Sequence, residues 1–152
     1  MEHVNIYLED NFKGIKTQKA AVIFLIEMMV KGVPATLYDL QVLTMTPNQA
    51  ALASLIMALS RLNKPCSLDI YLENQYVAAG IEKWISSWSA NDWKNSKNVT
   101  VENVVEWQLL TYMLSRHEYR LHLKENHSYK NWMMEKLTNV DFPKCEGTFE
   151  KE

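Results

Sequence analysis

The sequence IYLE occurs at residues Ile6–Glu9 and again at Ile70–Glu73. Each copy is an apolar, β-prone run that stops at a glutamate. Polar loop-forming residues follow both copies, Asp10-Asn11 after the first and Asn74-Gln75 after the second. Both copies are therefore predicted to be strands that end on the same acid. The topology between them decides whether the two acids meet.

The chain between the two copies is predicted to form two more strands and one helix. Val30–Pro34 contains a glycine and a proline and predicts a hairpin reversal. Thr46-Pro47 is typical of a helix start, because threonine caps a helix and proline favours its first position. Apolar residues then recur at helical spacing as far as Leu62. The predicted strands are His3–Leu8, Ala20–Met29, Ala35–Leu43 and Ser67–Leu72.

The C-terminal half is predicted to be mostly helical. Apolar residues keep a helical period from Gln75 to Trp88, and the polar stretch Ser89–Asn98 interrupts it. Thr100 is predicted to cap a second helix that runs to Met113. The last predicted elements are a strand at Tyr119–Leu123 and a helix at Asn131–Leu137. Residues 1–140 form the predicted domain, and residues 141–152 form a polar C-terminal tail.

A helical connection to the fourth strand allows the two IYLE strands to be neighbours. A right-handed crossover places the fourth strand parallel to the first. Glu9 and Glu73 then lie side by side at the sheet edge where open α/β sheets bind ligands. Adjacent carboxylates repel one another unless a cation separates them, and Mg²⁺ prefers oxygen ligands. The sequence predicts a cation between these acids, and two solvated loop carboxylates are the alternative.

Composition is that of an ordinary globular domain. The chain has 152 residues, of which 47% are apolar and 22% are charged. No apolar run approaches the roughly 20 residues that cross a bilayer, so no membrane association is expected. Cys66 and Cys145 are too few and too far apart for a disulfide framework or a zinc site, which favours a cytoplasmic location. The formal net charge of −2 lacks the basic surplus of proteins that mainly grip phosphates.

The residues around the second IYLE copy resemble the cellular type of ribonuclease H. In that family the corresponding run has the form T-D-S-Q-Y-V, then G-I, W-I, W, G-W-K and N-V-x-x-W-Q. The similarity is dense from Leu72 to Leu109, weaker from Val4 to Leu62 and thin from Tyr119 to Leu137. The matching residues are Leu72–Val77, Gly80-Ile81, Trp84-Ile85, Trp88, Trp93-Lys94, Asn103-Val104 and Trp107-Gln108.

The resemblance implies an α/β ribonuclease H-like fold, with a five-stranded mixed sheet in the order 3-2-1-4-5 and flanking helices. The family cleaves the RNA strand of RNA–DNA hybrids with two Mg²⁺ ions that four acids hold. Carried over by position, the first acid falls on Glu9, the third on Glu73 and the fourth on Glu135. The second acid falls on Ala51, which cannot bind a metal.

These departures predict a lost or impaired ribonuclease activity. Each Asp-to-Glu exchange lengthens a side chain by one methylene, whereas Mg²⁺ requires near-ideal octahedral geometry. A displacement of about 1 Å can lower a rate about a hundredfold. Asp10, Gln49 and Asn48 are alternative oxygen ligands for a weak Mg²⁺ or Mn²⁺ site, and for Asp10 this requires a shift of strand register. His127 is the candidate for the mobile histidine that assists product departure in the family.

Positions that contact the hybrid in the family are partly kept. Asn48 and Gln75 fall on amide positions that read the minor groove. The family's basic protrusion is replaced by Ser89–Asp92, which carries no cation. The lysines available for phosphate contacts are Lys94 and, around the first loop, Lys13, Lys16 and Lys19.

Three functions follow from these residues. The first is a domain that binds RNA–DNA hybrids or other nucleic acid, with lost or impaired ribonuclease activity. The second is an active metal-dependent ribonuclease H with a glutamate-based site. The third is a scaffold that keeps the fold for contacts with a protein partner. In each case the expected state of this chain is a monomer.

Overall fold

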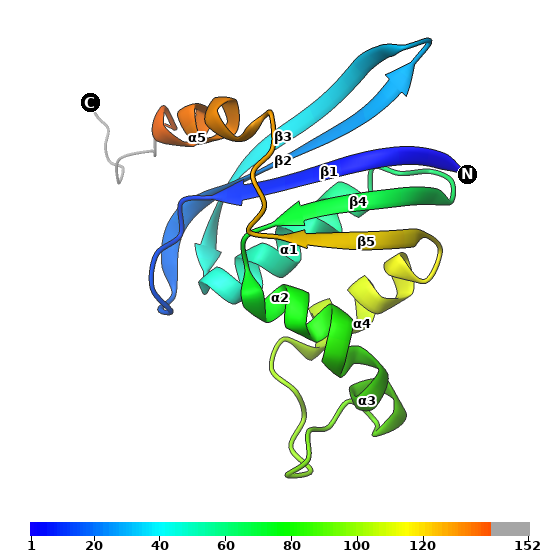
Figure 1. Ribbon diagram of the computed structural model, residues 1–152. Helices are drawn as coiled ribbons and strands as arrows, with labels where there is room; N and C mark the ends of the chain where they lie inside the picture. Colours follow the sequence, from blue (N-terminus) through cyan, green and yellow to red (C-terminus); the bar gives the residue numbers. More distant parts are fainter. Residues whose placement is uncertain (141–152) are drawn as a thin grey trace, which may run out of the picture.

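The structure is a computed structural model that describes residues 1–140 and contains one five-stranded sheet (Figure 1). The strand order is β3-β2-β1-β4-β5, with β1, β2 and β3 antiparallel and β1, β4 and β5 parallel. The predicted order and the parallel pairing of the two IYLE strands are confirmed. The predicted tail, residues 141–152 with Cys145, lies outside the described residues. The strands are β1 Glu2–Asp10, β2 Gln18–Val30, β3 Val33–Met45, β4 Cys66–Leu72 and β5 Glu118–Leu123.

The helices agree with the predicted ones except at two places. The predicted helix from Gln75 to Trp88 is divided, because a π-helical turn separates two short α-helices. The prediction that Thr100 caps the next helix is wrong. Thr100 pairs with Lys94 in an isolated β-bridge, and the helix begins later, after Asn103. The bounds are α1 Pro47–Leu59, α2 Gln75–Ala79, η1 Gly80–Trp84, α3 Ile85–Ala90, α4 Val104–Leu114 and α5 Lys130–Thr138.

The helices cover both faces of the sheet, as Figure 1 shows. Side chains of a strand alternate between its faces. On one face, Ile6 and Leu8 of β1 pack in a large core with α1 and α4. On the opposite face, Tyr7 packs in a smaller core with Met133 and Leu137 of α5. Within residues 1–140, no helix is long and apolar enough to cross a membrane.

The sequence of α1 accounts for its start and its position. Thr46 accepts a hydrogen bond from the Gln49 amide at 3.2 Å, and Pro47 occupies the first helical position, as predicted. Leu52, Leu55 and Leu59 follow at helical spacing and are buried against the sheet. Ala51 and Ser54, in the first half of α1, lie near the ends of β1 and β4.

Trp107 of α4 fixes the second helical layer. Its side chain is fully buried, and its indole nitrogen donates a hydrogen bond to Tyr76 Oη at 2.9 Å. The indole ring lies directly over Gly80, so that a Cβ atom at this glycine would fall onto ring atoms. The glycine is required here for close approach, not for an unusual backbone angle.

Gly80→Ala is expected to destabilise the fold by about 1–3 kcal/mol, because a buried indole has no room to retreat from an added methyl group. Urea unfolding would measure the loss. Ser87→Ala, on exposed α3, serves as the control and should leave stability nearly unchanged. Equal stabilities of the two variants would contradict the close packing of Gly80 and Trp107.

Candidate functional site

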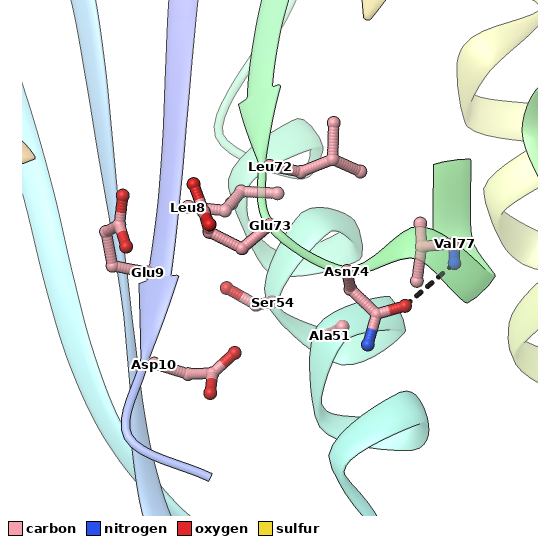
Figure 2. A pocket seen from close by; sticks show the side chains of 9 residues that line it. All are labelled: Leu8, Glu9, Asp10, Ala51, Ser54, Leu72, Glu73, Asn74 and Val77. Carbon is pink, nitrogen blue, oxygen red and sulfur yellow. Dashed lines mark hydrogen bonds between the residues drawn. The ribbon is translucent and has the colours of Figure 1, made fainter. Parts of the chain in front are cut away.

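A small pocket lies where β1 and β4 end beside α1 (Figure 2). Its volume of about 20 Å³ has room for about one water molecule or one ion. The pocket edge is the one at which the sequence predicted two acids to meet. The lining residues are Leu8, Glu9, Asp10, Ala51, Ser54, Leu72, Glu73, Asn74 and Val77.

Asp10 is the carboxylate of β1 that faces α1. It follows Leu8 by two residues and so lies on the same face of the sheet. Figure 2 shows its carboxylate directed toward Ala51 and Ser54. Its Oδ1 accepts a hydrogen bond from the Phe12 amide at 2.9 Å. Ordinary strand alternation thus brings Asp10 to the pocket without the register shift that the sequence analysis required.

The environment of Asp10 disfavours its charged form. Burial raises the pKa of this carboxyl above its ordinary value, and the hydrogen bond from Phe12 offsets only part of the effect. The negative charges of Glu9 and Glu73 raise the pKa further. The carboxylates of Asp10, Glu9 and Glu73 are therefore close enough at this edge for their charges to repel one another.

Glu9 lies in the pocket wall, but its carboxylate is held from the α5 side of the sheet. Its side chain is only 4% exposed. Oε2 accepts a hydrogen bond from His127 Nε2 at 3.0 Å, and Oε1 lies 3.4 Å from Lys130 Nζ. The same ammonium lies 3.3 Å from Oε2 of Glu73. Glu9 and Glu73 are thus neighbours, as predicted, and Lys130 joins them.

His127 is fixed in place. Its side chain is 3% exposed and packs against the ring of Tyr7, with ring centroids 4.4 Å apart. Nδ1 accepts a hydrogen bond from the Tyr129 amide at 3.2 Å, so the proton of the neutral ring lies on Nε2, which donates to Glu9. The predicted role of His127 in product departure stays a prediction.

The α1 side of the pocket carries no acid. Ala51 lies there, as Figure 2 shows, and Gln49 is turned away to donate to Glu106 at 2.8 Å. Asn48 accepts a hydrogen bond from Asn74 at 3.1 Å. The Ser54 hydroxyl is buried and, among the described residues, has no hydrogen-bond partner.

The predicted fourth acid is not part of the pocket lining. Glu135 lies exposed in α5, past the helix start that carries Lys130. Over residues 1–140, no three His, Cys, Asp or Glu side chains are arranged to hold one metal ion. Ala51 offers no ligand atom, and Lys130 places a positive charge between two of the carboxylates. The residues present therefore do not fit the two-metal centre that the family resemblance implies.

The candidate nucleic-acid contacts lie in three places. Gln75 is exposed at the start of α2, near Asn48 and its partner Asn74. Lys13 and Lys16 are exposed in the first loop, whereas Lys19 lies in β2. Lys94 lines a groove of about 490 Å³ beside α3. The other lining residues of this groove are Trp84, Ser87, Trp88, Asn91, Asn95 and Ser96.

Two structural features were not predicted from the sequence. The first is the position of Lys130 between two acids. A lysine at the first residue of a helix could have indicated it, because the helix dipole favours acids there. The stacked pair Trp84 and Trp88, with ring centroids 6.4 Å apart, is the other. Trp107 is fully buried in the core, whereas Trp84 is half exposed.

The RNase H family model matches residues 12–140 of this chain. Ribonuclease H of Bradyrhizobium diazoefficiens is 41% identical over 83 residues, which cover 55% of this chain and 54% of that protein. Ribonuclease H of Legionella pneumophila (strain Corby) is 34% identical over 97 residues, which cover 62% and 68%. The matched part thus spans about half the length of the first of these relatives.

Solved structures of the same fold match most of the chain. LC9-RNase H1, a type 1 RNase H with the type 2 active-site motif, gives a TM-score of 0.69 at 18% identity, covering 90% of this chain and 71% of that one. A foamy viral protease-reverse transcriptase in complex with RNA/DNA hybrid gives a TM-score of 0.66 at 13% identity, covering 90% and 19%. This chain belongs to the ribonuclease H family, and the predicted fold is confirmed.

Asp10→Asn is expected to raise the melting temperature at pH 7 by a few degrees. Asparagine keeps the acceptor for the Phe12 amide but removes a charge that the site disfavours. Because the folded-state pKa of Asp10 lies above its ordinary 3.8, its ionisation costs stability at higher pH. The gain should therefore vanish as the pH falls below about 4, which thermal unfolding at several pH values would measure.

Asp69→Asn is the matched control, for which the expected change in stability at pH 7 has the opposite sign. Burial raises the pKa of Asp69, but hydrogen bonds from His122 and His3 outweigh it and leave the pKa below its ordinary 3.8. The ionised form therefore stabilises the fold above that pH, and the variant should be less stable at pH 7. A loss of stability in both variants would contradict the unfavourable charge at Asp10.

Proposed function

We propose that this protein binds RNA–DNA hybrids through its ribonuclease H fold and has lost efficient cleavage of the RNA strand. The observation that carries the proposal is Ala51, which occupies the α1 wall of the pocket opposite Asp10 and Glu73. The resemblance puts the helix acid of the family at this position. Without it, the edge lacks one of the oxygen ligands that would confine a divalent cation.

The amide cluster supports hybrid binding. Asn74 donates to Asn48 and also accepts from the Val77 amide at 2.8 Å, so it ties the start of α1 to the start of α2. Gln75 is left exposed at the same place. Amide side chains can both donate and accept, which suits base edges and 2′-hydroxyls in a shallow minor groove.

The groove beside α3 supports contacts to a nucleic-acid backbone and bases. Trp84 is 50% exposed and stacks near Trp88, and Lys94 brings a positive charge to the same groove. Aromatic faces with a nearby cation form a sequence-tolerant platform for bases. The whole chain has a formal net charge of −2, so we expect weak affinity.

Two further parts of the proposal concern cofactor and setting. Mg²⁺ or Mn²⁺ is expected to bind weakly, because Ala51 supplies no oxygen ligand and Lys130 already contacts Glu9 and Glu73. The cytoplasmic location stays a prediction, with which the free thiol of buried Cys66 agrees.

A scaffold for protein contacts is the second candidate. One stripe of α4 exposes three large apolar side chains, Val105 at 70%, Leu109 at 46% and Tyr112 at 65%. Exposed apolar residues grouped in this way favour a protein partner. The active ribonuclease is the third candidate, and cleavage by the unaltered protein would support it.

Hybrid binding should be measurable by fluorescence anisotropy at low ionic strength and should weaken as salt rises, with a shallow slope. Asn48→Ala combined with Gln75→Ala should weaken binding about tenfold, because two amide contacts are lost. Gln41→Ala, on the exposed edge of β3, is the control and should bind like the unaltered protein. Absence of salt-dependent binding would favour the scaffold.

Restoring the missing acid should restore cleavage. The triple change Ala51→Glu, Glu73→Asp and Lys130→Met gives the pocket three carboxylates of the family's types, with Asp10 already present, and removes the ammonium that contacts Glu9 and Glu73. We expect measurable Mn²⁺-dependent cutting of the RNA strand in a gel assay with labelled hybrid. Ala51→Gln with Glu73→Asn should stay inactive. Cleavage by the unaltered protein at a comparable rate would overturn the proposed loss.

A further inference from the structure

Lys130 lies between the carboxylates of Glu9 and Glu73. Its ammonium lies 3.4 Å from Glu9 Oε1 and 3.3 Å from Glu73 Oε2. Glu9 comes from β1, Glu73 directly follows β4, and the lysine comes from α5 on the opposite face from α1. The three groups are brought together only by the fold.

We propose that the Lys130 ammonium is the resident cation of this site: it neutralises Glu9 and Glu73 and thereby keeps a divalent metal ion out. This inference deepens the proposed loss of cleavage and rests on it for its functional meaning. The geometry itself is independent of whether the protein binds a hybrid.

The charges that face Lys130 support this assignment. Asp10 feels the charges of both Glu9 and Glu73, so the edge holds three interacting carboxylates. His127, the other partner of Glu9, donates its proton from Nε2 and can do so as a neutral ring. Lys130 is then the cation that contacts these acids in the part of the chain that the structure describes.

The position of Lys130 in its helix also supports its pairing with Glu9 and Glu73. It is the first residue of α5, where the positive end of the helix dipole disfavours a cation. Burial would lower the pKa of Lys130, but the attraction of Glu9 and Glu73 outweighs it and leaves the pKa above its ordinary value. The carboxylates therefore account for an ammonium at an otherwise unfavourable place.

An ammonium and a divalent metal ion make different demands on the same acids. The lysine needs only hydrogen-bond acceptors, so the longer side chains of two glutamates and the missing ligand at Ala51 do not matter. A divalent ion needs several oxygens in fixed geometry and would have to displace Lys130 first. Metal binding to the unaltered protein should therefore be weak.

Mn²⁺ binding at low salt, followed by the electron paramagnetic resonance signal of free Mn²⁺, tests the proposal without a nucleic acid. Lys130→Met should bind Mn²⁺ at least about tenfold more tightly than the unaltered protein, since a competing charge is removed. Lys136 lies in the same helix, but its ammonium contacts the rings of Tyr38 and Trp132 and not the acids. Lys136→Met therefore removes an equal charge without freeing a carboxylate. This control should bind Mn²⁺ like the unaltered protein.

Two more variants keep the test decisive. Adding Glu73→Gln to Lys130→Met should abolish the gain, because the freed carboxylate is removed. Lys130→Gln retains a hydrogen-bond donor for Glu9 without the charge, and it should show the gain even if the methionine variant fails to fold. Unchanged Mn²⁺ affinity in both Lys130 variants, or an equal gain in Lys136→Met, would overturn the proposal. A failure of hybrid binding would not affect these outcomes.

Discussion

The arrangement of the site depends on the pairing of the buried Glu9 carboxylate with His127 and Lys130. A charged group that is 4% exposed must be paired on both oxygens, because an unpaired buried charge costs several kcal/mol. His127 satisfies one oxygen and Lys130 the other. Through these two residues Glu9 fixes both the loop before α5 and the start of α5 against β1. Lys130 then extends the connection to Glu73, the residue after β4.

A second polar cluster supports the same helix. Glu27 of β2 accepts hydrogen bonds from Asn5 at 2.9 Å, from Tyr7 at 3.1 Å and from Tyr129, which directly precedes α5. Although burial disfavours the charge of Glu27, these hydrogen bonds hold its pKa below the ordinary value. Side-chain contacts on both sides of the α5 start therefore set the position of Lys130.

The pocket combines features that an optimally stable protein would lack. A half-buried Asp10 with a raised pKa costs free energy, and so does the buried Ser54 hydroxyl, which has no hydrogen-bond partner within residues 1–140. Such groups occur most often at sites shaped for a ligand. At the same edge Ala51 offers no ligand atom, and Lys130 contacts two of the carboxylates.

The family resemblance implied the sheet order, and the crossover rule predicted that Glu9 meets Glu73. The sequence by itself determined the hairpin and the start of α1, because turn residues, hydrophobic period and caps act over short distances. It misplaced the start of α4, since the loop from Lys94 to Asn103 is ordered by its own bridge and a left-handed residue. Strand alternation alone would have put Asp10 beside Ala51. Only the tertiary structure brought Lys130 between the two glutamates. The packing of α5 on the far face of the sheet depends on contacts between residues more than a hundred positions apart, such as Glu9 and His127.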